Sequence, residues 1–338
     1  MKDTDTPVQT GGRENITALF RKFYESSTIS GQLLSLLIVF VIFSVGTRGQ
    51  FLSPANLQTI LGLAGIPMII CLGVHLVIIM GAMDLSVEGI VALCASTAGF
   101  LIKNPTTSFN IGLWIFPVVL LMGGLAGLAN GVINTKLKIP SFISTLGISW
   151  AAFGLAVIIS GGKSTPLKDL RFQQLANGTV LGIPNITLIA LIIFVLLMFF
   201  QRKTSAGKHM YAIGGDEVLA KQAGVNISRI KIIVFAITGA LYGLAALFLV
   251  ARLNSAAARL GNNLLFPAMT AVAVGGVSLS GGVGGALNAV MGTLIVTALN
   301  NGLVLMQVSP YAQSAVNGIV LIAAVALTID RKKIGIIK

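Results

Sequence analysis

Two carboxylates are the first candidates for chemistry, because each lies in or beside a long apolar run. They are Asp84 and Glu88, and a third acid, Asp330, stands at the very end of the last run. An ionisable group in an apolar environment is costly, so it suggests a solute pathway. A structural role is the favoured alternative for Asp84, which follows Gly81 and precedes an apolar run, where a helix N-cap belongs. Glu88 would then lie one turn on, near the positive end of that helix.

Uncharged polar side chains form a second candidate set along the same apolar runs. Amides and hydroxyls with an occasional aromatic ring suit a neutral, hydroxyl-rich solute. Each one taken singly is better explained by a hydrogen bond between packed helices. Beside Asp84, the pathway candidates are Asn130, Ser144, Trp150, Asn288 and Asn301, drawn from a wider set that includes Asn134, Ser141, Thr145, Asn300 and Gln307.

The motifs that would indicate nucleotide or metal chemistry are incomplete. The glycine-rich run 275–285 follows no soluble strand, so close helix packing or a broken helix explains it better than a phosphate-binding loop. Residues 162–164 read Gly-Lys-Ser, but Val157 stands where a P-loop requires glycine. His75 and His209 are far apart and have no cysteine or acid cluster, so no metal site is predicted. No catalytic set can be assembled, and we expect no enzyme activity in this chain.

A polar interval, residues 202–231, has the pattern of a short displayed helix. Gly214 and Gly215 can supply the backbone angles of a turn. Asp216 then occupies an N-cap position, and residues 217–223 are good helix formers with an acid–lysine pair four residues apart. We expect this helix at the cytoplasmic face, with another protein docking on Gly214, Gly215, Asp216, Glu217, Ala220 and Lys221.

The composition places these candidates in a membrane. The 338 residues are 55% hydrophobic and 10% charged, with a mean hydropathy of +0.92, whereas about a quarter of the residues of an ordinary soluble chain are charged. The net charge of +13 is spread over the loops between apolar runs, which argues against nucleic acid as a partner. Cys71 and Cys94 lie inside apolar runs, so neither a disulfide nor redox chemistry is implied.

The apolar runs predict an all-α polytopic membrane protein of about ten transmembrane helices. Residues 1–29 form a polar cytoplasmic tail without a cleavable signal, and residues 30–338 form a single transmembrane domain. Counting from a cytoplasmic start, 16 of the 23 Lys/Arg fall on the cytoplasmic side, with both termini inside. The expected spans are 30–47, 60–81, 85–102, 112–135, 141–160, 185–201, 229–251, 264–277, 283–306 and 311–329, of which the eighth is short for a crossing.

Short sequence matches indicate an internal repeat of five spans, with halves of about 30–184 and 185–330. An odd number of spans gives the two halves opposite topology, as in many transporters. The matching landmarks are 81–86 with 275–280, 130–132 with 301–303, and 139–140 with 309–310.

Four segments together resemble the permease subunits of bacterial ABC importers for simple sugars, the ribose, galactose and autoinducer-2 group. The resemblance runs from Phe51 to Asp330. It is carried by MGAMDLSVEG (80–89), LANGVINTKLKIPSFISTLG (128–147), YAIGGDEVLAKQAGVN (211–226) and AVGGVSLSGGVGG (273–285). The third is the most specific, and in the family it forms the cytoplasmic coupling helix that fits a groove on the ATPase subunit.

The resemblance implies a multi-pass protein of the bacterial inner membrane that works in a complex. Two permease subunits, as a homodimer or heterodimer, would form the pathway within membrane lipid. Two ATPase subunits would bind ATP and Mg²⁺, so this chain itself needs no cofactor. An extracytoplasmic sugar-binding protein would deliver a monosaccharide or similar small polar solute.

One departure from the family pattern concerns specificity. Relatives usually carry a Glu-x-Asp pair before the glycine-rich run, where this chain has Leu265 and Pro267. The change leaves the sugar open and favours a second, different permease subunit that retains the acids. An ion-coupled secondary transporter stays the alternative, but such proteins usually place more charged residues within their spans, and it would give the capped helix no purpose. A membrane-embedded enzyme lacks a catalytic set.

Overall fold

The computed structural model describes residues 28–105 and 107–328, and this part of the chain is almost entirely helical. The predicted tail therefore lies outside the described residues except for 28 and 29, as does Asp330. The α-helices are α2 (Thr28–Gly46), α3 (Pro54–Ile79), α4 (Val87–Leu101), α5 (Ile115–Lys136), α6 (Ser141–Ser160), α7 (Leu170–Asn177), α8 (Asn185–Lys203), α9 (Ser205–Gly215), α10 (Glu217–Gln222), α11 (Ile227–Leu253), α12 (Leu265–Val274), α13 (Ala286–Leu305) and α14 (Pro310–Thr328).

Short elements fill several of the connections between helices. Single 3-10 turns are η1 (Gln50–Leu52), η2 (Gly112–Trp114) and η3 (Ala258–Gly261). Four two-residue strands pair antiparallel, β1 with β4 and β2 with β3. They are β1 (Thr165–Pro166), β2 (Thr179–Val180), β3 (Ile183–Pro184) and β4 (Ser255–Ala256).

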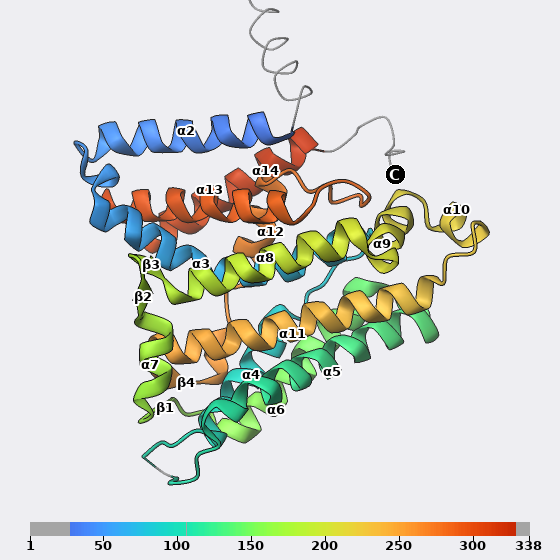
Figure 1. Ribbon diagram of the computed structural model, residues 1–338, viewed down its shortest axis with the longest axis horizontal. Coiled ribbons are helices and arrows are strands. Elements are labelled where there is room, and N and C mark those ends of the chain that lie inside the picture. The colour runs from blue at the N-terminus through green and yellow to red at the C-terminus, as the bar shows by residue number, and fades with distance from the viewer. Residues whose placement is uncertain (1–27, 106, 329–338) are drawn as a thin grey trace, which may run out of the picture.

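The long helices run side by side along the longest axis of the molecule (Figure 1). One end of the bundle carries α7 and the strand pairs, and the other carries α9 and α10; we call them the α7 end and the α10 end. A helix occupies each of the ten predicted intervals, and in the described part of the chain six helices are long and apolar enough to cross a membrane: α3, α5 with η2, α6, α8, α11 and α13. The protein is an all-α polytopic membrane protein.

Helix α3 forms the centre of the bundle. Its most apolar 18-residue window is 83% buried, whereas the windows of α5, α6 and α8 are buried to less than a third. A helix that is apolar on every side is stable only when other helices surround it. The surrounding helices of α3 are α8, α11, α12 and α13.

Helices α5 and α11 pack at backbone contact because glycines line both faces. A Cβ placed on Gly123 would lie 2.2 Å from the carbonyl oxygen of Gly239, and one placed on Gly239 would lie 2.1 Å from that of Gly123. A Cβ on Gly127, one turn further, would lie 2.1 Å from the carbonyl oxygen of Phe235. Small residues four apart are how membrane helices approach closely.

Two of the predicted spans are broken helices. Helix α4 has 15 residues and α12 has 10, lengths of about 22 and 15 Å against an apolar layer of about 30 Å. Non-helical chain, residues 80–86 before α4 and 254–264 before α12 apart from the turn η3, precedes each of these short helices. The short eighth span expected from the sequence is therefore present as a broken helix.

One of the three repeat landmarks is wrong for inverted halves. Segments 81–86 and 275–280 should lie at opposite ends, yet they are neighbours at the α10 end. The amide of Gly282 donates to the carbonyl of Ile79 at 2.8 Å, and a Cβ on Gly281 would meet the amide of Gly81. Glycine-rich turns resemble one another wherever a chain turns tightly, which explains the false match.

A single carboxylate organises the α7 end. Asp169 accepts hydrogen bonds from the side chain of Asn110 at 2.9 Å and from the backbone amide of Arg171 at the start of α7. The guanidinium of Arg171 donates two more, at 3.0 and 2.7 Å, and holds the pKa of the Asp169 carboxyl below its usual range. The stabilisation is therefore present at neutral pH and is lost only when the pH falls through that lowered pKa.

We expect Gly127→Ala to loosen the α5–α11 pair, because the added methyl group would overlap the carbonyl oxygen of Phe235. Such overpacking typically costs about 1–3 kcal/mol. The control is Gly154→Ala in α6, where no atom lies within 4 Å of the new Cβ. Thermal unfolding of the purified protein in detergent should show a lower midpoint for the first variant and no loss for the second. Equal midpoints would contradict the packing argument.

Candidate functional site

The predicted short helix is present as α10 at one extremity of the molecule (Figure 1). Asp216 caps it, since its Oδ1 accepts hydrogen bonds from the amides of Val218 at 2.8 Å and Leu219 at 2.9 Å. Gly224 follows the helix with a φ of 84°, a left-handed angle that suits glycine. The cap and the stop predicted from the sequence are therefore confirmed.

The exposed face of α10 differs from the predicted one. Ala220 is 5% exposed and packs inward, so this member of the predicted docking set is not available to a partner. Val218 and Leu219 are 67% and 61% exposed. The exposed face of α10 thus presents two apolar side chains together with its charged ones. Sequence reasoning missed them because on so short a helix the amphipathic face cannot be read from spacing.

Glu217 pairs with a different lysine from the one that spacing suggests. Its carboxylate lies 2.7 Å from the Nζ of Lys231 in α11, and not against Lys221 on its own helix. The two side chains line a cavity of about 580 Å³ together with Lys138, which precedes α6. Lys221 lines this cavity as well, so three lysines face one glutamate and the cavity between α10, α11 and the α5–α6 connection is positively charged.

Gly214 and Gly215 have helical angles and end α9, so the predicted glycine turn is wrong. Their surroundings differ sharply. A Cβ on Gly214 would lie 1.7 Å from the carbonyl oxygen of Ile79 and 2.6 Å from the amide of Gly282, whereas one on Gly215 would meet nothing within 4 Å. Glycine at 214 lets the backbone of α9 rest directly on the two chain breaks of the bundle.

Tyr211 strengthens this contact between α9 and the chain breaks. Its hydroxyl donates to the carbonyl of Gly284 at 2.8 Å, and burial raises the pKa of the phenol. The polar segment that carries α10 is thus fixed to the end of α3 and to the loop between α12 and α13. A force applied to α10 would reach the broken helices over a few residues.

Asp84 lies in the non-helical segment and is 6% exposed. Its Oδ1 accepts from the amide of Ser86 at 2.8 Å and from the Ser86 hydroxyl. Helix α4 begins at Val87 with Ser86 in the N-cap position, so Asp84 stabilises the turn before the helix and does not cap it. The amide nitrogen of Asn130 donates to the Ser86 hydroxyl at 2.9 Å. Two pathway candidates, Asp84 and Asn130, therefore share the Ser86 hydroxyl as a hydrogen-bond partner.

Glu88 joins the two broken helices. It lies in the first turn of α4, as expected, but its Oε1 also accepts from the amides of Leu264 at 3.1 Å and Leu265 at 3.2 Å. These amides begin α12 and have no partner within that helix. The negative charge thus lies at the positive ends of α4 and α12 at once.

The remaining pathway candidates are dispersed. Ser144 donates to the carbonyl of Ser141 in its own helix, and Asn288 donates to the carbonyl of Gly275, closing the α12–α13 loop. Trp150 is 69% exposed on α6, while Asn301 is buried in α13. No single site within the described residues unites them with Asp84.

The structure also contains a chain of buried hydrogen bonds that the sequence did not suggest. The amide of Ala286, at the start of α13, donates to Oε1 of Gln201 at 3.0 Å. The Nε2 of Gln201 must then donate to Nε2 of His75 at 2.8 Å, which leaves the other ring nitrogen to donate to the carbonyl of Cys71. His75 is therefore neutral and joins α3 to α8 and α13. Gln201 appeared only as the end of an apolar run.

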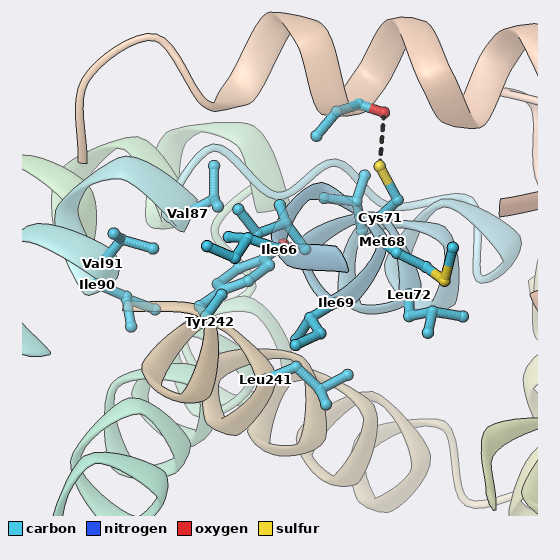
Figure 2. Close-up of a cluster of buried hydrophobic side chains, with 14 of the residues drawn as sticks. Ile66, Met68, Ile69, Cys71, Leu72, Val87, Ile90, Val91, Leu241 and Tyr242 are labelled. Atoms are coloured by element: carbon cyan, nitrogen blue, oxygen red, sulfur yellow. Dashed lines mark hydrogen bonds between the residues drawn. The ribbon is translucent and has the colours of Figure 1, made fainter. Parts of the chain in front are cut away.

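A second cavity, of about 380 Å³, lies between α3, α11, α12 and α13. Beside it, Figure 2 shows side chains of α3, α4 and α11 in one cluster, where the Cys71 thiol donates to the carbonyl of Ala268 in α12. Of the two positions of the departure, Pro267 lines the cavity, whereas Leu265 is buried and is not among its lining residues. Polar groups reach the cavity from Arg252, Asn263, Thr293, Thr297 and Asn300.

Comparison with known proteins decides the family. Residues 56–325 match the family described as branched-chain amino acid transport system / permease component. The chain belongs to this family. It is 36% identical to the ribose import permease protein of Bacillus subtilis over 90% of this chain and 92% of that protein. Against the ribose import permease protein of Haemophilus influenzae the identity is 34%, over 86% and 90% of the two chains.

A third relative is the galactose/methyl galactoside import permease protein of Escherichia coli, 32% identical over 92% of this chain and 97% of that protein. No solved structure matches the chain. As a member of a permease family, this multi-pass protein serves transport and is not an enzyme. Among the residues described, no group of three His, Cys, Asp or Glu side chains could hold a metal ion.

We expect Gly214→Ala to separate α9 from the bundle of this permease, because its methyl group would overlap the carbonyl oxygen of Ile79. Gly215→Ala is the matched control, one residue away in the same helix, with open space around its Cβ. Limited proteolysis of the purified protein should cut the segment 204–226 faster in the first variant only. Equal cleavage rates would show that α9 does not depend on this contact.

Proposed function

We propose that this chain is the membrane-spanning subunit of an ABC importer that moves a monosaccharide or similar small polar solute into the cytoplasm. The observation that carries the proposal is the capped helix α10, displayed beside a cationic cavity in a chain whose relatives are named ribose and galactose import permeases. ATP and Mg²⁺ would be bound by a separate ATPase subunit, and this chain would hold no cofactor. The charged and apolar surface of α10, with Asp216, Glu217 and Lys221, would dock on that subunit.

The architecture proposed for the permease is ten spans in two inverted halves, α2–α6 and α8–α14, with both termini in the cytoplasm. The packing supports this pairing: α5 lies on α11 as α13 lies on α3, and α6 lies on α4 as α14 lies on α12. The two broken helices, α4 and α12, are then equivalent. The landmarks at 139–140 and 309–310 lie near opposite ends of the bundle, as inverted halves require. Lys138 lines the same cavity as Glu217 at the α10 end, and Met306 lies beside Gly46 at the other end.

The proposed partners beyond the ATPase are a second permease subunit, identical or different, and an extracytoplasmic sugar-binding protein. Apolar side chains on the outer helices support a surface covered by lipid and by the second subunit; they include Val45, Ile158, Leu196, Ile319 and Ile322. The proposed location is the bacterial inner membrane, with the α10 end in the cytoplasm. That orientation follows from the basic residues of segment 202–231.

The proposed solute pathway passes the chain breaks, where Asp84 and Asn130 lie. Broken helices in transporters expose backbone polar groups and helix ends to a solute near the middle of the membrane. The dispersed candidates Ser144, Trp150, Asn288 and Asn301 would contribute only where a second subunit completes the pathway.

Purification from the native membrane in mild detergent, with mass spectrometry of the recovered proteins, tests the importer. An ATPase subunit and ATP-dependent uptake of radiolabelled D-ribose or D-galactose by reconstituted vesicles would support it. A second, distinct permease would indicate a heterodimer. Recovery of this chain alone, under conditions that keep other ABC complexes intact, would favour the ion-coupled transporter.

We expect Glu217→Lys to lower ATP-driven uptake about tenfold or more, since it breaks the ion pair with Lys231 and reverses the charge offered to the ATPase. The double variant Glu217→Lys/Lys231→Glu restores the internal pair and serves as the control. Uptake and ATP hydrolysis are measured together in vesicles that contain equal amounts of inserted permease. Full recovery in the double variant would show that Glu217 acts only within this chain.

A further inference from the structure

The segment from Gly81 to Ser86 is non-helical, and its first two amides, of Gly81 and Ala82, donate to the carbonyls of Ile78 and Val77 in the last turn of α3. Backbone amides in an apolar environment must find partners, because a buried amide without one destabilises the fold substantially. The Ser86 amide donates to Asp84, which leaves the amides of Met83, 45% exposed, and of the partly buried Leu85 to find acceptors outside the segment. No strand lies beside it in the described part of the chain, so side chains must supply them.

Three hydroxyls of α6 supply these acceptors. The amide of Met83 donates to Oγ of Ser141 at 3.1 Å, and that of Leu85 donates to Oγ1 of Thr145 at 3.0 Å. One step further, the amide of Gly89, in the first turn of α4, donates to Oγ of Ser149 at 3.2 Å. The three acceptors follow one another in the same order as the three donors.

The spacing of the two sets fits by simple geometry. Residues four apart on a helix lie on nearly the same face, about 6 Å apart along the axis. Amides two apart in extended chain point to the same side and are separated by about 6.6 Å. Ser141, Thr145 and Ser149 are each four residues apart, so one face of α6 can follow an extended chain and then the start of a helix.

A separate observation shows that α6 is pressed against this region. A Cβ on Gly89 would lie 2.1 Å from the carbonyl oxygen of Ser149 and 2.5 Å from its Cα. The hydroxyl of Thr145 donates its proton to the carbonyl of Ser141 at 2.8 Å, which orients the oxygen that accepts from Leu85. The acceptors are therefore held in place by backbone contact and by their own helix.

We propose that Ser141, Thr145 and Ser149 are positioning residues for transport, which hold the non-helical segment and the start of α4 to α6 as one unit. The proposal rests on the proposed importer function for its link to ATP. Ser141 directly follows the connection whose Lys138 lines the cationic cavity beside α10. A movement of α10 driven by the ATPase would thus reach the non-helical segment through α6, as well as through Gly214.

The decisive variant is Thr145→Val, which keeps the shape of the side chain and removes the acceptor for Leu85. Thr145→Ser keeps the hydroxyl and should rescue it. Ser160→Ala is the control, because that hydroxyl lies on the same helix, outside the candidate pathway, and donates to the carbonyl of Val157 within the helix. Amide hydrogen exchange of residues 82–90 is measured by mass spectrometry on the complete transporter in lipid nanodiscs.

We expect exchange about tenfold faster in Thr145→Val and unchanged in the other two variants. Uptake of D-ribose per ATP hydrolysed should fall in Thr145→Val and stay unchanged in Thr145→Ser and in the control variant. Unaltered exchange in Thr145→Val overturns the proposal, as does equal loss in Ser160→Ala. If Thr145→Val does not fold, Ser141→Ala and Ser149→Ala are measured in its place. If the unmodified protein is recovered without an ATPase subunit, the proposed function fails, whereas the exchange result still decides the role of α6.

Discussion

The need to satisfy backbone amides inside an apolar bundle shapes the functional half of this molecule. Non-helical chain precedes α4 and α12, and several backbone amides there have no partner within a helix. Groups of several kinds accept hydrogen bonds from these backbone amides. Hydroxyls of α6 serve the segment before α4, the carboxylate of Glu88 serves the first amides of α12, and the carbonyl of Ile79 accepts from Gly282. Polar side chains within the spans are thus largely committed to backbone.

This commitment changes how the intramembrane acids are understood. Glu88 is held by two amides at a helix end, and Asp84 by the amide and hydroxyl of Ser86, so both have structural partners. A carboxylate bound in this way stabilises one arrangement of the broken helices. Moving the helices apart would strip Glu88 of its partners, which gives the bundle a defined resting state that an external energy source must overcome. Such a state suits a transporter driven by a separate ATPase.

Local patterns in the sequence predicted the helices and the cap of α10, whereas long-range partners could not be predicted. Hydropathy located ten helical intervals because an apolar run long enough to span a membrane has few alternatives. The cap at Asp216 depends on residues two and three positions away, so spacing alone revealed it. The pairing of Glu217 with Lys231 joins positions fourteen residues apart, across two helices. The inward position of Ala220 and the chain of hydrogen bonds through Gln201 likewise depend on packing that no local pattern encodes.

The residues at the start of α12 fit the same constraint. Leu265 provides the first amide of α12 to Glu88, so an acid there would place a second carboxylate beside the first. Pro267 falls in the first turn of α12, where a missing amide costs nothing. The adjoining cavity is lined mostly by apolar residues, with Arg252, two asparagines and two threonines as its polar groups, and no acid is among its lining residues. Pro267 therefore adds to a largely apolar wall.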